Sequence, residues 1–412
     1  MLILTFGSAA VLGWRPAVVA WRIHSAKKSL AEGEFEAALK QLEAAEELQP
    51  ESAEVLFLLA RANRRADRLH QVADFLDRAL AAGWDSEQIE QQRSLYLVQS
   101  GRFERAELFL QRCLRRGVED QLAEEIYEAL SKGFLKTYRI GDALFCLQYW
   151  IQWKPRSVEP RLMLASVYEQ LEDAKSAVKQ YRVVLEIDPE RPEIHRRIAD
   201  HLFSLQDLEG ARDHYSQCLA RDSNDVTALL GIALCERRFA RTESAREKLR
   251  ELLKRDLTTS QRVQVLAELA DILLRDDRNP EGAIKLLIEA ERLDDNSHRV
   301  NQALAIAYRK TGKIDLADSH EQKSTAIVQR LNRLATITKE LLRTPKNAEL
   351  RYEAGKLFME QGMKRAGAEW LSTALIFDPQ HRGARLALAE YYDETGDHAA
   401  ARRHRKSVGL DK

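Results

Sequence analysis

Histidine and cysteine are the side chains of this sequence that could hold a metal ion or act as nucleophiles, and their spacing favours neither role. His195 and His201 are six residues apart, so they do not share a helix face as an i, i+4 ligand pair does. His201 and His214 could meet across a pair of helices, but two histidines without a third ligand make a weak metal site. The cysteines form no CxxC pair; they are Cys113, Cys146, Cys218 and Cys235.

The short motifs of common enzymes are also missing from the sequence. It contains no GxGxxG, no GxxxxGK[ST], no GxSxG and no HExxH. We therefore predict no catalytic residue, no metal, no cofactor and no enzymatic activity. The chain has 64 Lys and Arg against 64 Asp and Glu, and this neutral balance argues against nucleic-acid binding.

The elements that position these side chains are predicted to be helices. Nine prolines and 18 glycines in 412 residues are few for an all-β protein, and good helix formers dominate the sequence. Hydrophobic residues make up 45% of the chain, which is enough for a core. The fold class is predicted to be all-α.

A small residue recurs every 34 residues along most of the sequence. Within four blocks every step is 34, and between the blocks the steps are 37, 38 and 50. The period fits two amphipathic helices joined by a tight turn, with the small residue where the helices cross. Turn glycines fit the bend between the two helices at Gly33, Gly101, Gly312, Gly362 and Gly396, and prolines end second helices at Pro155, Pro189 and Pro379. The recurring residues are Ala38, Val72 and Ala106; Ala143, Ala177, Ala211 and Ala245; Ala283 and Ala317; Gly367 and Ala401.

This pattern resembles the tetratricopeptide repeat (TPR), a helix pair of 34 residues. The best matches are LMLASVYEQLEDAKSAVKQYRVVLEIDP, ALAIAYRKTGKIDLA and EAGKLFMEQGMKRAGAEWLSTALIFDP. The resemblance covers about residues 19–412 and implies a right-handed α-solenoid of about eleven helix pairs behind an N-terminal hydrophobic helix.

The resemblance also implies a concave groove lined by the first helix of each pair. Basic groove residues could bind an acidic segment of a protein or peptide partner, and a solvated helix face is the alternative. The last two units offer acids in the same places, at Glu360, Glu390, Asp393 and Glu394. The expected groove residues are Phe57, Arg61, Arg64, Arg65, Lys132, Lys136, Arg237, Arg238, Arg309 and Lys310.

The N-terminal segment 1–22 is hydrophobic, and we expect an uncleaved single-pass membrane anchor there. A cleaved signal and an amphipathic capping helix are the alternatives, because Arg15 interrupts the apolar run. The basic residues after this run place the bulk of the chain in the cytoplasm by charge count, and a periplasmic location is the other option. The architecture is similar to bacterial membrane-anchored TPR proteins. The expected function is a membrane-tethered scaffold for protein–protein interaction, with a soluble or exported TPR adaptor as the alternative.

Two segments depart from the repeat. Residues 124–155 carry Phe134, Phe145, Tyr149, Trp150 and Trp153, which either pack or form an interaction patch. Residues 314–342 lack Gly and Pro and predict one long helix or two with a kink, whose apolar stripe at Ile327, Leu331, Leu334 and Leu341 packs on the next unit or forms a short dimer seam. The sequence leaves the oligomeric state open. The expected parts are the hydrophobic segment 1–22, a main repeat array 23–323, a long-helix insertion 324–345 and a C-terminal pair 346–412.

Overall fold

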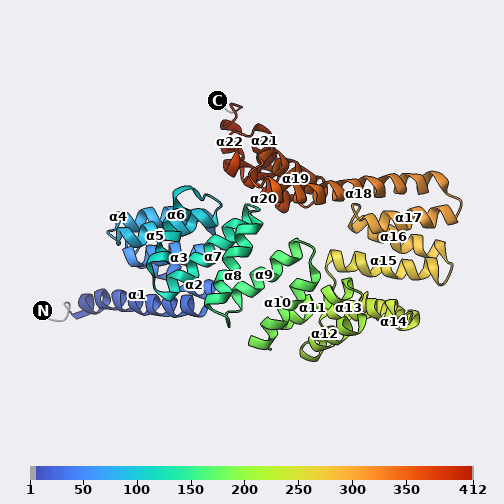
Figure 1. The fold of residues 1–412 in the computed structure, drawn as a ribbon, viewed down its shortest axis with the longest axis horizontal. Coiled ribbons are helices and arrows are strands. Elements are labelled where there is room, and N and C mark those ends of the chain that lie inside the picture. Colours follow the sequence, from blue (N-terminus) through green and yellow to red (C-terminus); the bar gives the residue numbers. More distant parts are fainter. Residues whose placement is uncertain (1–5, 411–412) are drawn as a thin grey trace. The chain divides into compact units, whose positions relative to one another are not determined.

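The computed structural model describes residues 6–410, with side chains from Arg15 on apart from that of Glu104. Over these residues the chain forms 22 α-helices and no strand (Figure 1), so the all-α prediction and the estimate of eleven helix pairs are confirmed. The chain divides into two compact units, Met1–Cys146 (unit 1) and Leu147–Lys412 (unit 2). The division falls inside α8. The boundaries expected after residues 22, 323 and 345 stay a prediction.

The helices of both units are short, and most have 9–17 residues. Unit 1 contains α1 (Phe6–Glu32), α2 (Phe35–Glu46), α3 (Ala53–Arg65), α4 (Val72–Ala81), α5 (Ser86–Gln99), α6 (Glu104–Arg116) and α7 (Asp120–Lys136), and α8 (Ile140–Trp153) crosses the division. Unit 2 contains α9 (Glu159–Gln170), α10 (Ala174–Ile187), α11 (Pro192–Ser204), α12 (Leu208–Arg221), α13 (Val226–Arg238), α14 (Thr242–Leu252), α15 (Thr259–Arg275), α16 (Pro280–Leu293), α17 (His298–Lys310), α18 (Ile314–Arg343), α19 (Ala348–Glu360), α20 (Lys364–Phe377), α21 (Arg382–Glu394) and α22 (His398–Lys406).

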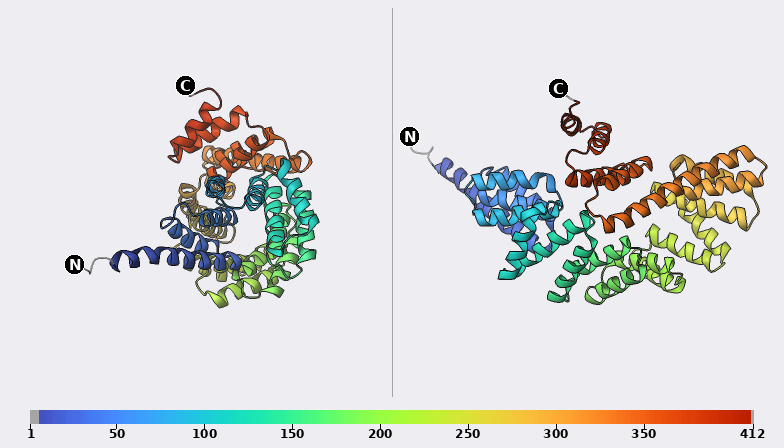
Figure 2. Two further views of the ribbon diagram at one scale, coloured as in Figure 1. Left: turned by 90° about the vertical axis from the view of Figure 1, so that its left-hand side faces the viewer. Right: turned by 45° about the horizontal axis from the view of Figure 1, so that its top comes forward.

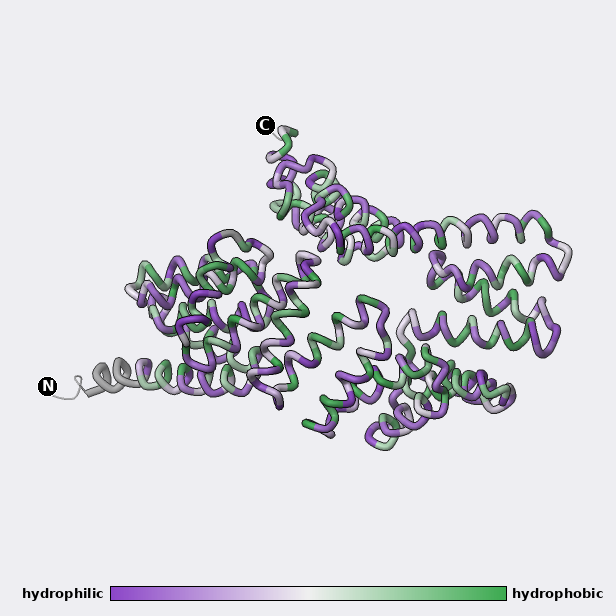
Figure 3. Tube along the Cα trace, in the orientation of Figure 1, coloured by the Kyte–Doolittle hydropathy of each residue, from purple (hydrophilic) through white to green (hydrophobic). Residues whose placement is uncertain are grey.

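Consecutive helices pack on each other as successive pairs, which Figure 2 shows from two further sides. Apolar and polar residues alternate along each helix (Figure 3), as expected for helices that bury one face. Odd-numbered helices also contact the next odd-numbered helix, as α5 contacts α7 and α15 contacts α17. The first helices of successive pairs therefore lie next to each other within each unit.

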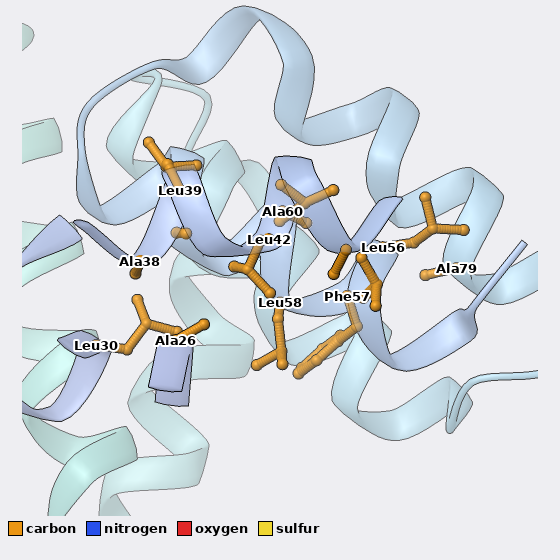
Figure 4. Packing of buried hydrophobic residues seen from close by; sticks show 14 of the residues in the cluster. Ala26, Leu30, Ala38, Leu39, Leu42, Leu56, Phe57, Leu58, Ala60 and Ala79 are labelled. Atoms are coloured by element: carbon orange, nitrogen blue, oxygen red, sulfur yellow. The ribbon is translucent and has the colours of Figure 1, made fainter. Parts of the chain in front are cut away.

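The repeated small residues lie where the helices cross. All eleven are buried, from Ala38 in α2 to Ala401 in α22, so the repeat register read from the sequence is confirmed. Figure 4 shows the crossing in unit 1, where Ala26 and Leu30 of α1 meet Ala38 of α2. A small side chain there lets two helix backbones approach closely, and larger neighbours fill the space around it.

Helix starts follow the ordinary chemistry of capping. The residue before the helix accepts a hydrogen bond from a backbone N–H of the first turn, which satisfies a donor that the helix itself leaves free. The side chains that cap in this way include Ser52, Asp85, Asp173, Asp207, Asp225, Thr258, Asn279, Ser297, Asn347, His381 and Asp397.

A residue with left-handed backbone geometry lies between the two helices of every pair. Five of these are the glycines expected from the sequence, with φ between 77° and 90°. The other six pairs carry a residue with a Cβ at the same repeat position, with φ between 51° and 63°. A residue with a Cβ costs roughly 1–2 kcal/mol in this region, so these six turns store strain. They are Asp67, Tyr138, Glu172, Gln206, Ala240 and Arg278.

The predicted membrane anchor over residues 1–22 is wrong. No helix within residues 6–410 combines the length and the apolar character that crossing a membrane requires. The physical reason lies in α1, which carries Arg15 and Pro16 in its middle and then buries Val19, Ala26 and Leu30 against α2. The end of the apparent apolar segment thus belongs to the first helix of the first pair. Residues 1–5 of that segment lie outside the described residues.

The segment without Gly and Pro is one continuous helix, α18, of 30 residues. Ile327 and Leu341 of the expected apolar stripe are buried, as predicted for packing on neighbouring helices. Leu331 is exposed, because the buried face of the second half of α18 runs through Ile337 instead.

The strain in these turns can be tested by substitution with glycine. We expect Ala240→Gly to raise the free energy of unfolding by up to about 1 kcal/mol, because glycine adopts the left-handed conformation without strain. Ala326→Gly at an exposed site inside α18 should instead lower it by about 1 kcal/mol. Urea unfolding followed by circular dichroism measures both, and a loss of stability in Ala240→Gly would contradict the strain.

Candidate partner-binding groove

All ten groove residues expected from the sequence lie on odd-numbered helices, as first helices of their pairs. Unit 1 holds six of them, on α3 and α7, and unit 2 holds four, on α13 and α17. The two groups have different surroundings.

Three arginines of α3 gather around a buried glutamate of α7. Arg64 is fully buried, donates from Nε to Oε1 of Gln92 at 3.0 Å and forms an ion pair with Glu125. Arg61 Nε donates to Oε1 of the same carboxylate at 2.8 Å. Arg64 was expected to be exposed in the groove, and this expectation is wrong. Arg64 is buried, and Glu125 compensates its charge inside unit 1.

A second carboxylate, Glu128, lies one turn further along α7. Arg65 Nε is 3.0 Å from its Oε2, and Lys132 Nζ donates to its Oε1 at 2.7 Å. The guanidinium of Arg65 also lies over the ring of Phe35, 4.7 Å from the ring centre. Lys136 is exposed at the end of α7.

The electrostatics of this site follow from its burial. Burial lowers the pKa of Arg64, against the opposing effect of Glu125 and Glu128. Burial alone would raise the pKa of Glu125, but Arg64, Arg61 and Arg65 outweigh it and hold that pKa below its usual range. Neither glutamate was among the groove residues expected from the sequence. Glu125, Glu128 and Lys132 are spaced so that they lie on one face of a helix, and this pattern could have indicated a cluster of charges there.

Phe57 is a core residue of unit 1. It is buried, stacks on Trp84 with ring centres 4.9 Å apart, and is labelled in Figure 4. Phe57 was expected in the groove because it lies on the first helix of a pair. In the structure its side chain is buried in the core of unit 1 and does not line a groove.

Unit 2 contains an open groove of about 830 Å³ on its odd-numbered helices. Its walls come from α11, α13, α15 and α17, and it includes three of the expected residues, Arg237, Arg238 and Lys310. Ile306 of α17 is 41% exposed within it, which is high for a large apolar side chain on a helix that packs on both sides. Phe203, Leu234 and Ala303 extend this apolar lining.

Ion pairs between neighbouring helices line the same groove. Arg237 of α13 reaches Asp271 at 3.1 Å and Asp276 at 2.9 Å. Arg299 of α17 reaches Glu268 at 2.6 Å. Arg275 binds Asp271 from the same helix. The groove thus has five cationic side chains and three carboxylates.

Two of the five groove cations pair with no carboxylate in the part of the chain that the structure describes. Arg238 is exposed, and its guanidinium lies over the ring of Phe203 at 5.7 Å from the ring centre. Lys310 Nζ donates to the backbone oxygen of Leu274 at 3.1 Å. Arg309 lies outside the groove and pairs with Asp318 and Glu321 of α18.

The acids of the last two pairs are largely engaged. Asp393 pairs with Arg405 and His398, and Glu394 pairs with Lys364 at 2.6 Å. Glu360, at the end of α19, and Glu390, inside α21, are exposed. An acidic end to the groove stays a prediction.

The histidines meet in a different combination from the one expected. His214 lies against His195, with the two Nδ1 atoms 3.0 Å apart, and His201 instead contacts Glu169 at 2.8 Å. Among the described residues, no three His, Cys, Asp or Glu side chains gather in a way that could hold a metal ion. Burial raises the pKa of Cys146, Cys218 and Cys235 to about 11, so these are thiols at neutral pH.

The aromatic residues of residues 124–155 divide between core and surface. Trp150 and Phe134 are buried, as the packing alternative predicted. Phe145, Tyr149 and Trp153 are exposed and recur every four residues along α8, as the patch alternative predicted.

The sequence of the chain matches a known family of repeats. A family model described as "Tetratricopeptide repeat" matches residues 26–87, 162–226 and 196–260, which confirms the resemblance found in the sequence. No curated protein sequence matches the chain.

Several solved structures are similar to the chain at low sequence identity. A tetratricopeptide repeat protein from Parabacteroides merdae is 13% identical, over 71% of this chain and 99% of its own, with a TM-score of 0.35. A chain of the APC/C hetero-tetramer Cut9-Hcn1 is 13% identical, over 95% and 80%, with a TM-score of 0.36. YrrB, described as a TPR protein with an unusual peptide-binding site, is 20% identical, over 50% and 97%, with a TM-score of 0.30.

The buried charges of unit 1 predict a large stability effect. Glu125→Gln should lower the free energy of unfolding by about 3 kcal/mol or more, because it leaves buried arginines without their countercharge. The matched change Glu36→Gln removes the carboxylate of an exposed pair with Arg68 and should cost less than about 1 kcal/mol. Urea unfolding compares the two variants, and equal small losses would show that the buried network adds little.

The histidine pair predicts a dependence of stability on pH. Burial lowers the pKa of His195, with help from Arg221, and it lowers that of His214, with help from His195 and Arg182. The unfolded chain therefore takes up protons first, so stability is complete above the unfolded pKa of about 6.5 and falls as the pH drops below it.

The double variant His195→Gln/His214→Gln should weaken this pH dependence of the unfolding midpoint between about pH 7 and pH 5. The remaining dependence comes in part from His320 and His404, whose pKa values burial also lowers. His70→Gln, at an exposed histidine, is the control. An unchanged slope in the double variant would contradict the assignment.

Proposed function

Since the chain carries tetratricopeptide repeats, we propose that it is a protein-binding adaptor whose partner occupies the groove of α11, α13, α15 and α17. One observation carries this proposal. The groove combines an exposed apolar side chain, Ile306, with five cations against three carboxylates. The proposal matches the adaptor that the sequence analysis gave as its alternative, and it does not depend on a membrane tether.

The chemistry of the groove favours an acidic partner segment. Arg238 and Lys310 have no carboxylate partner within the described chain, so carboxylates of a bound segment can form charge-assisted hydrogen bonds with them. An apolar side chain of the same segment covers Ile306 and removes it from water. The surrounding ion pairs, such as that of Arg237 with Asp271, join neighbouring helices and hold the lining in place before the partner arrives.

The proposed ligand is therefore an extended peptide segment with at least one carboxylate near an apolar residue. A volume of about 830 Å³ accommodates several residues of such a segment. We assign the chain no catalytic step.

Selection of a random peptide library on the full chain tests this function. Enriched peptides should carry Asp or Glu beside an apolar residue. The double variant Arg238→Glu/Lys310→Glu should weaken their binding at least about tenfold, because the loss of even one charge-assisted contact costs about 1.4 kcal/mol or more.

A matched control changes the same total charge outside the groove. Lys248→Glu/Arg250→Glu alters two exposed cations of α14, the second helix of the pair that contains Arg238, and should keep the affinity within about twofold. Equal losses in the two double variants would mean that net charge, and not the groove, attracts the peptides.

A further inference from the structure

The second helix of the third pair, α6, carries a row of arginines on its exposed face. Arg105, Leu108, Arg112 and Arg115 follow one another at intervals of three, four and three residues, so they lie along one side of the helix. All four side chains are exposed, and no acidic residue lies among them. We call these four residues the α6 stripe.

The arginines of the α6 stripe have no carboxylate partner within the described part of the chain. Arg112 Nε donates instead to the backbone oxygen of Leu108 in its own helix, at 3.4 Å. Glu107 of the same helix is engaged elsewhere, because it pairs with Arg139 at 2.9 Å. The stripe therefore presents three positive charges to solvent without a countercharge.

The other helix pairs show that the repeat does not require this charge. The four positions of the stripe have equivalents in every pair, at fixed distances from the recurring small residue, which is Ala106 in α6. None of the other ten pairs has more than two cations at these positions, and the pair with two, which contains α16, also has Glu289 there. A role in packing or capping the repeat would recur along the chain, so the charge is particular to α6.

Two exposed apolar side chains accompany the arginines. Leu108 is 59% exposed, and Phe145, at the equivalent position of the next pair on α8, is 62% exposed. The equivalent residue is polar or charged in the other nine pairs. The pair between Arg139 and Glu107 holds the start of α8 beside α6 within unit 1. Consecutive pairs thus combine unpaired positive charge with apolar surface at a position that is otherwise polar.

We propose that the α6 stripe binds an acidic amphipathic helix of a protein partner. Intervals of three and four residues are those at which one helix packs along another, so a partner helix can follow the stripe for about 15 Å. Carboxylates of the partner meet the arginine forks, and an apolar side chain of the partner covers Leu108.

The composition of the surface favours this occupant over two others. A nucleic acid offers phosphates to the arginines but no apolar side chain to Leu108 and Phe145. A membrane surface requires a broad apolar face, and this surface has two apolar side chains. The stripe lies on a second helix of unit 1, so it is separate from the groove of first helices in unit 2 and does not rest on the function proposed for that groove.

A labelled helical peptide of about 20 residues tests the proposal. Its one charged face carries three Glu and one Leu at the spacing of the stripe, and Ala and Gln fill the other positions. The peptide is titrated by fluorescence anisotropy into the full chain carrying Arg238→Glu and Lys310→Glu, which reverse the charge of the unit 2 groove. A single-stranded RNA and vesicles with phosphatidylserine are titrated in parallel.

We expect the peptide to bind saturably, with one peptide per chain, and to bind more weakly at higher ionic strength. Adding Arg105→Gln and Arg112→Gln should weaken the binding at least about fivefold, and Leu108→Gln alone should weaken it about threefold or more. Glutamine is a good helix former and all three sites are exposed, so an unchanged circular dichroism spectrum is expected. The matched control Lys248→Gln/Arg250→Gln removes two exposed cations of α14 and should change the affinity less than about twofold.

The proposal is overturned if the peptide does not bind saturably, or if Arg105→Gln/Arg112→Gln and Leu108→Gln both bind it as tightly as their parent. It is also overturned if the RNA or the vesicles bind in a way that depends on these residues while the peptide does not. Sedimentation velocity tests the remaining occupant, since an oligomer of the chain that the same substitutions dissociate would assign the stripe to a second copy instead.

Discussion

Each helix pair of this chain can bury its apolar face only against its neighbours, and that constraint shapes the rest of the molecule. A small residue at each crossing sets how closely two helices approach, and all eleven of these residues are buried. A left-handed residue in every pair then reverses the chain within a few residues, even in the six pairs where a Cβ makes that turn strained. The short pairs that result place the first helices of successive pairs next to each other within each unit, where their side chains meet.

The two units use their first helices differently. In unit 1 the side chains of these helices pair with one another, because Arg64 reaches past α5 to a carboxylate two pairs further along the chain. In unit 2 the ion pairs join the first helices of adjacent pairs, as between Arg237 of α13 and Asp271 of α15. These ion pairs stabilise the walls of the groove and leave the groove open. The first helices thus form an internally compensated surface in one unit and an accessible groove in the other.

The repeat could be predicted from the sequence because its signals are local: small residues at a fixed period, turn glycines and prolines after helix ends. The environment of a single cation could not, because it depends on residues far away in the chain. Arg64 and Arg238 both occupy positions that the repeat pattern predicts to be exposed. Arg64 nevertheless pairs with the carboxylate of Glu125, whereas Arg238 pairs with no carboxylate among the described residues. The anchor prediction was wrong for a related reason. Val19 counts toward the apolar run of residues 1–22 in the sequence, but in the structure it belongs to the packing face of α1.

The proposed function places the partner on the odd-numbered helices α11, α13, α15 and α17 of unit 2. Hydrogen exchange of the full chain, with and without an acidic peptide selected on it, tests this claim most directly. We predict slower exchange of backbone amides in α13, α15 and α17, whose side chains line most of the groove. Slower exchange confined to even-numbered helices such as α14 and α16, with α13, α15 and α17 unchanged, would contradict the account.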